Sequence, residues 1–303
     1  MTTPSWMNGP PKRILLATDL SARCDRALDR AVSLAAQWQA RLVVLHVLED
    51  EPATLREAGL PSWRRPPDPA TLARKQLLAD VGSIAEKATI IIEQGEPAEA
   101  ILRHAEAEGC DLIVTGVARD ELLGRFNLGR TVDRLLRRSR MPVLFVRGRA
   151  RSPYRHIVVA TDFSESSRHA FTAAMQFFPQ QRLTIFHAYD APMSGLMSDS
   201  TSYQREYRKV AVQDCEAFLQ GANGGASGGP HPQVLIEQGA PGFLLREYAR
   251  EQGADLVVLG THGRSAIFEA LLGSVAKEIM EYLPCDALVI REPRAAVEVR
   301  QGS

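Results

Sequence analysis

The chain has 303 residues, 45% of them hydrophobic, and a formal net charge of zero. This length suggests about two domains, and the composition is typical of a folded globular protein rather than a disordered chain. Zero net charge excludes a whole-molecule field that would attract nucleic acid or a membrane surface. The sequence has no run of about 18 apolar residues, so it predicts no membrane-spanning helix.

Cysteine usage and the N-terminal stretch bear on the compartment. Cys24, Cys110, Cys215 and Cys285 are scattered without the spacing of a metal site. The first stretch, MTTPSWMNGPPKR, lacks the apolar core of a signal peptide. We therefore expect a cytoplasmic protein with reduced thiols and no metal-binding cluster.

In the first half of the chain, short apolar runs alternate with segments of helical periodicity. The apolar runs predict buried strands, and apolar residues spaced three and four apart predict the helices between them. Ser21 is placed to cap the first helix, and Pro97 stands in the first turn of a later one. The expected strands are ILLAT, RLVVLHV, TIIIEQG, DLIVTG and PVLFVR, and the expected helices cover 21–38, 70–87 and 97–109, with one more before the last strand. This alternation indicates a parallel sheet that is covered on both faces.

The second half of the chain repeats the first. RILLATDLS returns as HIVVATDFS, and Gly116 and Gly260 are separated by the same number of positions as Gly129 and Gly273. Order and spacing persist over the full repeat, which indicates a domain duplication. We therefore expect an α/β protein with two tandem doubly wound domains, 1–150 and 151–303. Each should contain a five-stranded parallel sheet with helices on both faces.

The segment GTHGRSAIFEALLGS, residues 260–274, connects the fourth strand of the second repeat to a helix. Open parallel sheets bind ligands beyond the carboxyl ends of their strands, where the strand order reverses. Gly260 and Gly263 can adopt positive φ and let backbone amides approach an anion. Gly273 and Ser274 open a helix whose free amides and dipole suit a phosphate. Asp162 ends the first strand of the same repeat and is placed to accept hydrogen bonds from ribose hydroxyls.

These residues resemble the universal stress protein family, whose nucleotide-binding members carry G-x2-G-x9-G-S/T after the fourth strand. The glycines and the serine of the segment match without a gap, and the resemblance extends over nearly the whole chain. It implies a bound ATP, or the related ADP or AMP, with Mg²⁺ able to accompany the phosphates. It implies adenine near Ala160 and Ala188, ribose near Asp162, and phosphates on Gly260, Gly263, Gly273, Ser274 and the amide of Val275.

Simpler structural roles stay open for the same residues. Asp162 can terminate a strand and stabilise a turn, and Ser274 can be a plain N-cap. Gly260 and Gly263 can be turn formers only. His46 and His187 occupy equivalent strand ends, and we interpret them as packing residues rather than ligands.

The first repeat departs from the family pattern. Arg119 replaces the second glycine and Arg130 replaces the serine, although Gly116, Gly129 and Asp19 are retained. A side chain at position 119 stands where backbone should approach phosphate, so we expect an empty or differently used site. The alternative is that Arg119 and Arg130 bind another anion directly.

Two further segments receive a structural interpretation. GANGGASGGPHP, residues 221–232, runs from a helix into a strand, opposite to a phosphate loop, and predicts a linker. Residues 119–155 are rich in arginine but carry no set of stacking aromatics. We interpret this basic segment as a solvated face or an interdomain contact rather than a nucleic-acid site.

The leading functional hypothesis is a cytoplasmic stress-response protein that binds ATP in its second domain as a regulatory ligand. The alternative is a nucleotide-free interaction scaffold. An ATP-consuming ligase or pyrophosphatase needs a glycine–serine loop after the first strand, where this chain has ATDLSAR and ATDFSES. We therefore expect no enzyme activity beyond slow ATP hydrolysis.

The expected partners are an adenine nucleotide and a protein that the sequence does not identify, with no membrane. The last strands, PVLFVR and ALVIRE, are short apolar edges that would otherwise template aggregation. Resemblance to the family implies that the two domains pair through these strands as an intramolecular pseudo-dimer. Association of whole chains into a homo-oligomer stays open.

Overall fold

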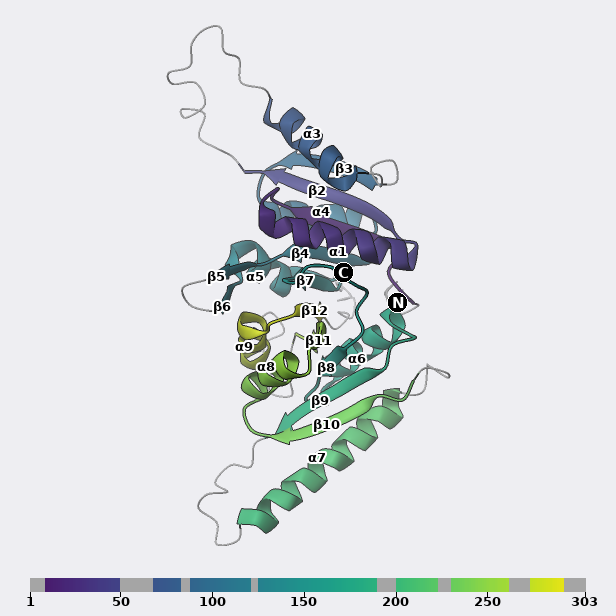
Figure 1. Ribbon diagram of the computed structural model, residues 1–303, viewed down its shortest axis with the longest axis vertical. Helices are drawn as coiled ribbons and strands as arrows, with labels where there is room; N and C mark the ends of the chain where they lie inside the picture. Colours follow the sequence, from purple (N-terminus) through teal and green to yellow (C-terminus); the bar gives the residue numbers. More distant parts are fainter. Residues whose placement is uncertain are drawn as a thin grey trace, which may run out of the picture. The chain divides into compact units, whose positions relative to one another are not determined.

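A computed structural model describes residues 9–49, 68–82, 88–120, 125–189, 200–222, 230–261 and 273–291. The chain divides into two compact units. The first domain contains Pro11–Leu136 and Val143–Pro153, and the second contains the chain from Tyr154 onward together with Arg137–Pro142. Both are α/β domains with a central parallel sheet, which confirms the predicted fold class (Figure 1).

The first domain alternates strands and helices along the chain. Its strands pair in the order β3-β2-β1-β4-β7, so the order reverses between β1 and β4. The elements are β1 (Arg13–Thr18), α1 (Ala22–Trp38), β2 (Arg41–Leu48), α3 (Pro69–Val81), β3 (Ala88–Gln94), α4 (Pro97–Ala107), β4 (Leu112–Gly116), β5 (Ala118–Asp120), β6 (Arg125–Asn127), α5 (Gly129–Arg138) and β7 (Val143–Val146).

The second domain repeats this topology. Its strand order is β10-β9-β8-β11-β12, with the reversal between β8 and β11. The elements are β8 (Ile157–Ala160), α6 (Glu165–Phe177), β9 (Leu183–Tyr189), α7 (Ser200–Ala222), β10 (Gln233–Gln238), α8 (Pro241–Glu251), β11 (Leu256–Gly260), α9 (Ser274–Tyr282) and β12 (Asp286–Ile290).

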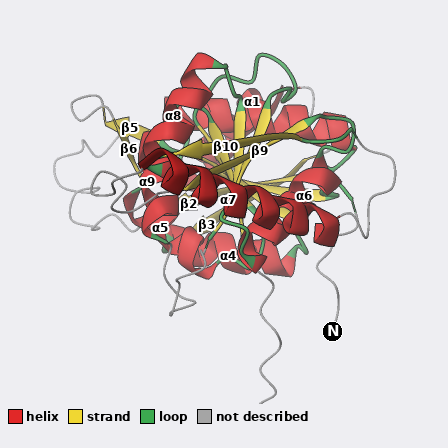
Figure 2. Cartoon of the chain, turned by 90° about the horizontal axis from the view of Figure 1, so that it is seen from below, coloured by secondary structure: helices red, strands yellow, loops and turns green. Residues whose placement is uncertain are grey.

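The cores follow from the apolar runs that predicted the strands. Ile14, Leu15 and Leu16 in β1 are fully buried, as are Ile157 and Val158 in β8. A strand that is buried at consecutive positions must be covered on both faces. The crossovers β1–α1–β2 and β3–α4–β4 step across the sheet in opposite directions. Right-handed connections therefore place α1 and α4 on opposite faces, as Figure 2 shows.

The duplication extends to single hydrogen bonds at the start of each sheet. Asp111 Oδ2 accepts from the backbone N–H of Lys12 at 2.8 Å and of Arg13 at 3.0 Å. Its repeat counterpart Asp255 accepts in the same way from Arg155 at 2.8 Å and from the following residue at 3.3 Å. These contacts satisfy the amides that lead into β1 and β8, because those amides precede the strand ladder.

The connection between the domains is held by side chains on both sides of Pro153. In the first domain, Arg26 Nη1 donates to the carbonyl of Arg147 at 2.8 Å, and Arg30 Nη1 donates to the carbonyl of Ser152 at 2.9 Å. In the second domain, the Tyr154 hydroxyl donates to Asp286 Oδ2 at 2.6 Å. The chain therefore passes from one domain to the other within a very short stretch.

The first domain contains one element that the sequence interpretation missed. We expected a damaged glycine loop over 116–131, but β5 and β6 form a two-stranded antiparallel hairpin there (Figure 1). Ala118 pairs with Asn127, and Arg119 pairs with Phe126. The apolar and polar residues of this segment show no clear alternation, so the hairpin left no period-two signal that could predict it.

Two other expectations concern the helices. The glycine-rich segment 221–232 begins with the last two residues of α7 and leads to β10, in the helix-to-strand direction predicted for a linker. Its residues 223–229 lie outside the described residues. Pro97 begins α4, as predicted.

Within the described residues, no helix is both long enough and apolar enough to cross a membrane.

Candidate functional site

In the second domain, the predicted site residues lie around the reversal of strand order. Ala160 ends β8, Asp162 follows two positions later, and Gly260 ends β11, while Ala188 lies near the end of β9. β8 pairs in parallel with both β9 and β11, so the carboxyl ends of all three strands meet at one edge. Open parallel sheets bind ligands at such an edge.

The N-terminus of α9 completes this edge. Gly273 is the N-cap of α9, and its N–H donates to the carbonyl of Thr261 at 3.1 Å, which joins the two ends of the segment 262–272. Ser274 is the first residue of the helix, and both it and Val275 are exposed. The prediction that Gly273 and Ser274 open a helix is confirmed. The alternative that Ser274 is the N-cap is wrong, because Gly273 occupies that position.

The start of α9 suits an anion because no side chain among the described residues caps it. The first amides of a helix lack partners within the helix. At α6, the Ser164 side chain accepts from the amide of Ser167, but at α9 the part of the chain that the structure describes supplies no side-chain cap hydrogen bond. Amides of this kind, together with the helix dipole, form an anion-binding arrangement. Gly263, the remaining glycine of the motif, lies outside the described residues.

Gly260 is a glycine for a reason that differs from the predicted one. The sequence left open that Gly260 uses the positive φ that glycine can adopt, but the described glycines with positive φ do not include it. A Cβ at Gly260 would lie 2.5 Å from the Ser166 hydroxyl oxygen and 2.9 Å from the carbonyl carbon and oxygen of Ser166. Gly260 is therefore required by this close approach and not by a positive φ. A glycine at the end of β11 allows the first turn of α6 to pack directly against the strand.

The turn after β8 holds Asp162 in a defined conformation. The Thr161 hydroxyl accepts from the N–H of Phe163 at 2.9 Å, and Asp162 Oδ1 accepts from the N–H of Ser164 at 3.1 Å. His187 Nδ1 lies 2.8 Å from the carbonyl of Thr161. Phe163 has a φ of 62°, which is strained for a residue with a bulky side chain. Asp162 therefore has the turn-stabilising role left open by the sequence, in addition to its place at the edge of the sheet.

The same turn occurs after β1 in the first domain. The Thr18 hydroxyl accepts from the N–H of Leu20 at 3.1 Å, and Asp19 Oδ1 accepts from the N–H of Ser21 at 2.9 Å. Leu20 has a φ of 59°, and His46 Nδ1 lies 2.9 Å from the carbonyl of Thr18. His46 and its counterpart His187 therefore fix the turns, which is the packing role expected for them. The repeated TD-x-S sequence was the signal for this turn.

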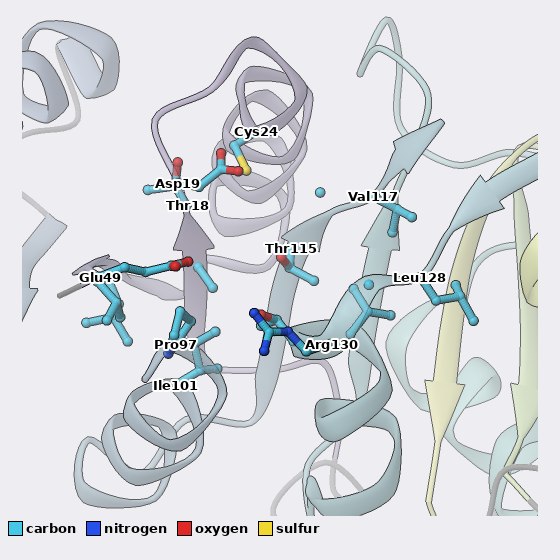
Figure 3. A pocket seen from close by; sticks show the side chains of 17 residues that line it. Thr18, Asp19, Cys24, Glu49, Pro97, Ile101, Thr115, Val117, Leu128 and Arg130 are labelled. Carbon is cyan, nitrogen blue, oxygen red and sulfur yellow. The ribbon is translucent and has the colours of Figure 1, made fainter. Parts of the chain in front are cut away.

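A pocket lies at the strand-order reversal of the first domain, where we expected an empty or differently used site. This first-domain pocket has a volume of about 250 Å³ and is lined by the ends of β1, β2 and β4 and by α4 and α5 (Figure 3). The predicted positions Asp19, Gly116, Gly129 and Arg130 all line it. Sequence reasoning missed Glu49, Pro97 and Ile101, which come from β2 and α4 and carry no motif of their own.

Cys24 also lines the first-domain pocket, but its thiol is not activated. Burial raises the pKa of Cys24 from a usual value of 9.0 to about 11, and the neighbouring Asp19 carboxylate contributes to the shift. A thiol with this pKa stays protonated at neutral pH and is a poor nucleophile. In the described part of the chain, no three His, Cys, Asp or Glu side chains are grouped so that they could hold a metal ion.

The raised pKa of Cys24 predicts a loss of stability at alkaline pH. The unfolded thiol loses its proton above about pH 9 while the folded thiol keeps it to about pH 11, so the free energy of unfolding falls between these values. Between pH 8 and pH 10.5 this group alone should remove about 2 kcal/mol. Urea unfolding at both pH values should show a smaller loss for Cys24→Ala than for the native chain. An equal loss in both proteins would contradict this origin.

The fold and site define a class: tandem α/β proteins in which each domain has a reversal of strand order, where open parallel sheets bind ligands. The sequence profile of the universal stress protein family matches residues 10–147 and again residues 153–291. The chain therefore belongs to the universal stress protein family, as a tandem two-domain member. This confirms the resemblance found in the sequence.

Individual relatives agree with the family assignment. A putative universal stress protein of Staphylococcus epidermidis is 30% identical over 143 residues, which cover 46% of this chain and 84% of that protein. A solved universal stress protein of Archaeoglobus fulgidus has a TM-score of 0.64 at 19% identity, covering 92% of this chain and 98% of its own. A putative universal stress protein of Pseudomonas aeruginosa has a TM-score of 0.64 at 20% identity, covering 95% of each chain. These two structures share the fold of the whole chain.

Proposed function

We propose that the second domain binds ATP, or the related ADP or AMP, and that the bound nucleotide acts as a regulatory ligand in a stress response. The observation that carries this proposal is the start of α9, which no described side chain caps and which lies in the same domain as Asp162 and the end of β11. A polyphosphate needs free amides, and a ribose needs a fixed acceptor. Both kinds of group belong to the same strand-order reversal.

Each site residue has a separate role in this proposal. The amides of Ser274 and Val275 and the Ser274 hydroxyl donate to phosphate oxygens, and Asp162 accepts from ribose hydroxyls. The hydrogen bonds of the turn hold the Asp162 backbone before the ligand arrives, which lowers the entropy cost of binding. In this proposal the purine ring packs against the small side chains of Ala160 and Ala188. A Mg²⁺ ion would enter with the phosphates, because the described residues offer it no preformed cluster.

Regulation would follow from a difference in nucleotide affinity between two states of the protein. The short connection at Pro153 and the strained turn at Phe163 are the structural elements on which such a difference can act. We propose no catalytic step for this site. The proposal does not identify the protein partner that binds the nucleotide-bound state. The competing function is a nucleotide-free interaction scaffold.

Isothermal titration of the full chain with ATP tests the proposal directly. We expect a stoichiometry near one, because the second domain keeps the motif and the first domain carries Arg119 and Arg130 instead. Two equivalent sites would show that these arginines do not prevent ATP from binding in the first domain. The absence of any heat or thermal stabilisation with ATP, ADP and AMP would favour the scaffold.

A further inference from the structure

The first-domain pocket is lined by an arginine, Arg130, from the start of α5. Arg130 is exposed at the start of α5, and its side chain extends into the pocket (Figure 3). Within the described residues it forms no hydrogen bond or ion pair. Arg134, one turn later on the same helix, is paired with Glu96 at 2.7 Å. Of these two arginines, Arg130 is therefore the one whose guanidinium is available to bind a ligand in the pocket.

The opposite wall of the pocket offers hydrogen-bond acceptors. Glu49 reaches into the pocket from the end of β2, and Thr18 and Asp19 lie at the end of β1 (Figure 3). Asp19 is held in place by the N–H of Ser21 at 2.9 Å. Carboxylates arranged opposite a guanidinium suit a molecule with hydroxyl groups at one end and an anion at the other. Apolar atoms from Pro97 and Ile101 line the space on one side.

The surroundings of the pocket argue against a triphosphate. Residues 118–120 and 125–127 pair with one another in the β5–β6 hairpin, so this backbone is not an open glycine loop. The volume of the first-domain pocket, about 250 Å³, is smaller than the volumes of about 300–1,000 Å³ of pockets that enclose drug-sized ligands. A guanidinium binds one phosphate well because its fork matches two phosphate oxygens.

We propose that the first-domain pocket binds a small hydroxylated phosphate monoester, of the size of a pentose monophosphate, through the Arg130 side chain. Its hydroxyl groups donate to Asp19 and Glu49, and its phosphate accepts from Arg130. This site is separate from the proposed ATP site, and it uses a side chain where the second domain would use backbone amides. The two domains would thus respond to different phosphate compounds.

The experiment is isothermal titration of the full chain with ribose 5-phosphate, with and without saturating ATP. We expect one site per chain in both conditions and no detectable binding of ribose without the phosphate. Arg130→Ala should weaken binding by about tenfold or more, because a charge-assisted hydrogen-bond pair is lost. Arg134→Ala is the matched control, since it removes the same charge from the same helix outside the pocket. It should leave the affinity unchanged.

The titration with ribose 5-phosphate tests the first-domain site independently of the ATP proposal. Because Arg130 lies in the first domain, its effect on ribose 5-phosphate does not depend on whether ATP binds elsewhere. Thermal melting checks that both variants fold, and alanine at an exposed helix position is well tolerated. No binding of ribose 5-phosphate, equal binding by ribose, or equal affinity of the native chain and Arg130→Ala would each overturn the proposal.

Discussion

Replacing Gly260 with alanine is expected to destabilise the second domain, even though the change adds only a methyl group. The new Cβ would lie 2.9 Å from the carbonyl carbon and oxygen of Ser166, and backbone atoms at the start of α6 cannot rotate away as a side chain can. Overpacking of this kind costs about 1–3 kcal/mol. Each kcal/mol lowers the melting temperature of a domain of 150–250 residues by about 2–4 °C. Calorimetry without nucleotide measures the effect.

Gly273→Ala is the matched control for this prediction. Gly273 belongs to the same motif, but its φ is −57°, and among the described residues an added Cβ would meet only the Thr261 carbonyl oxygen at 3.8 Å. The free energy of unfolding of this variant should therefore stay within about 1 kcal/mol of the native value, since only the preference for glycine over alanine at the N-cap is lost. Equal stability of Gly260→Ala and Gly273→Ala would contradict a packing role for Gly260.

Gly263→Arg should weaken ATP binding strongly, although it adds a positive charge near the proposed phosphate site. The change copies the residue at position 119 of the first domain into the matching position of the second. Charge alone predicts tighter binding, whereas steric fit predicts weaker binding. We expect fit to dominate, because under the proposal an arginine side chain would keep phosphate from close amide contacts and would add strain wherever glycine is needed for positive φ, which costs about 1–3 kcal/mol. That corresponds to roughly a ten- to a hundredfold loss of affinity.

The measurement for Gly263→Arg is ATP affinity by titration, together with the melting temperature of the ligand-free variant. Ser265→Arg is a suitable control, since it adds the same charge to the same segment at a position that already carries a Cβ. It should bind ATP at least as well as the native chain. Unchanged or tighter ATP binding by Gly263→Arg would refute the backbone-cradle hypothesis and point to anion capture by side chains.

Much of the architecture could be predicted from the sequence because it depends on local chemistry. The buried strands appear as uninterrupted apolar runs such as ILLA in β1, and Pro97 marks the first turn of α4. The duplication gave the same topology twice, and the reversal of strand order then located Asp162 and the start of α9 at one edge. These features need only periodicity, capping preferences and the handedness of crossovers.

The reason for Gly260 could not be predicted, because it depends on contacts between segments far apart in the chain. The motif spacing suggested a phosphate-binding role for Gly260. In the structure, Ser166 in α6 lies so close to Gly260 that no Cβ fits there. The β5–β6 hairpin likewise lacks a local signature, so Arg119 was interpreted within a loop rather than a strand.

The state of Arg130 was also decided only by the tertiary structure. In the sequence, Arg130 and Arg134 are two arginines of one basic segment. Arg130 stands at the serine position of the family motif, and Arg134 follows four residues later. The fold brings Glu96 to Arg134 and leaves Arg130 facing a pocket formed by three strand ends. The sequence by itself determined the family, the duplicated fold and the loss of the glycine motif in the first domain. Packing between distant segments decided which glycine is sterically required and which charge remains for a ligand, because neither property belongs to a residue alone.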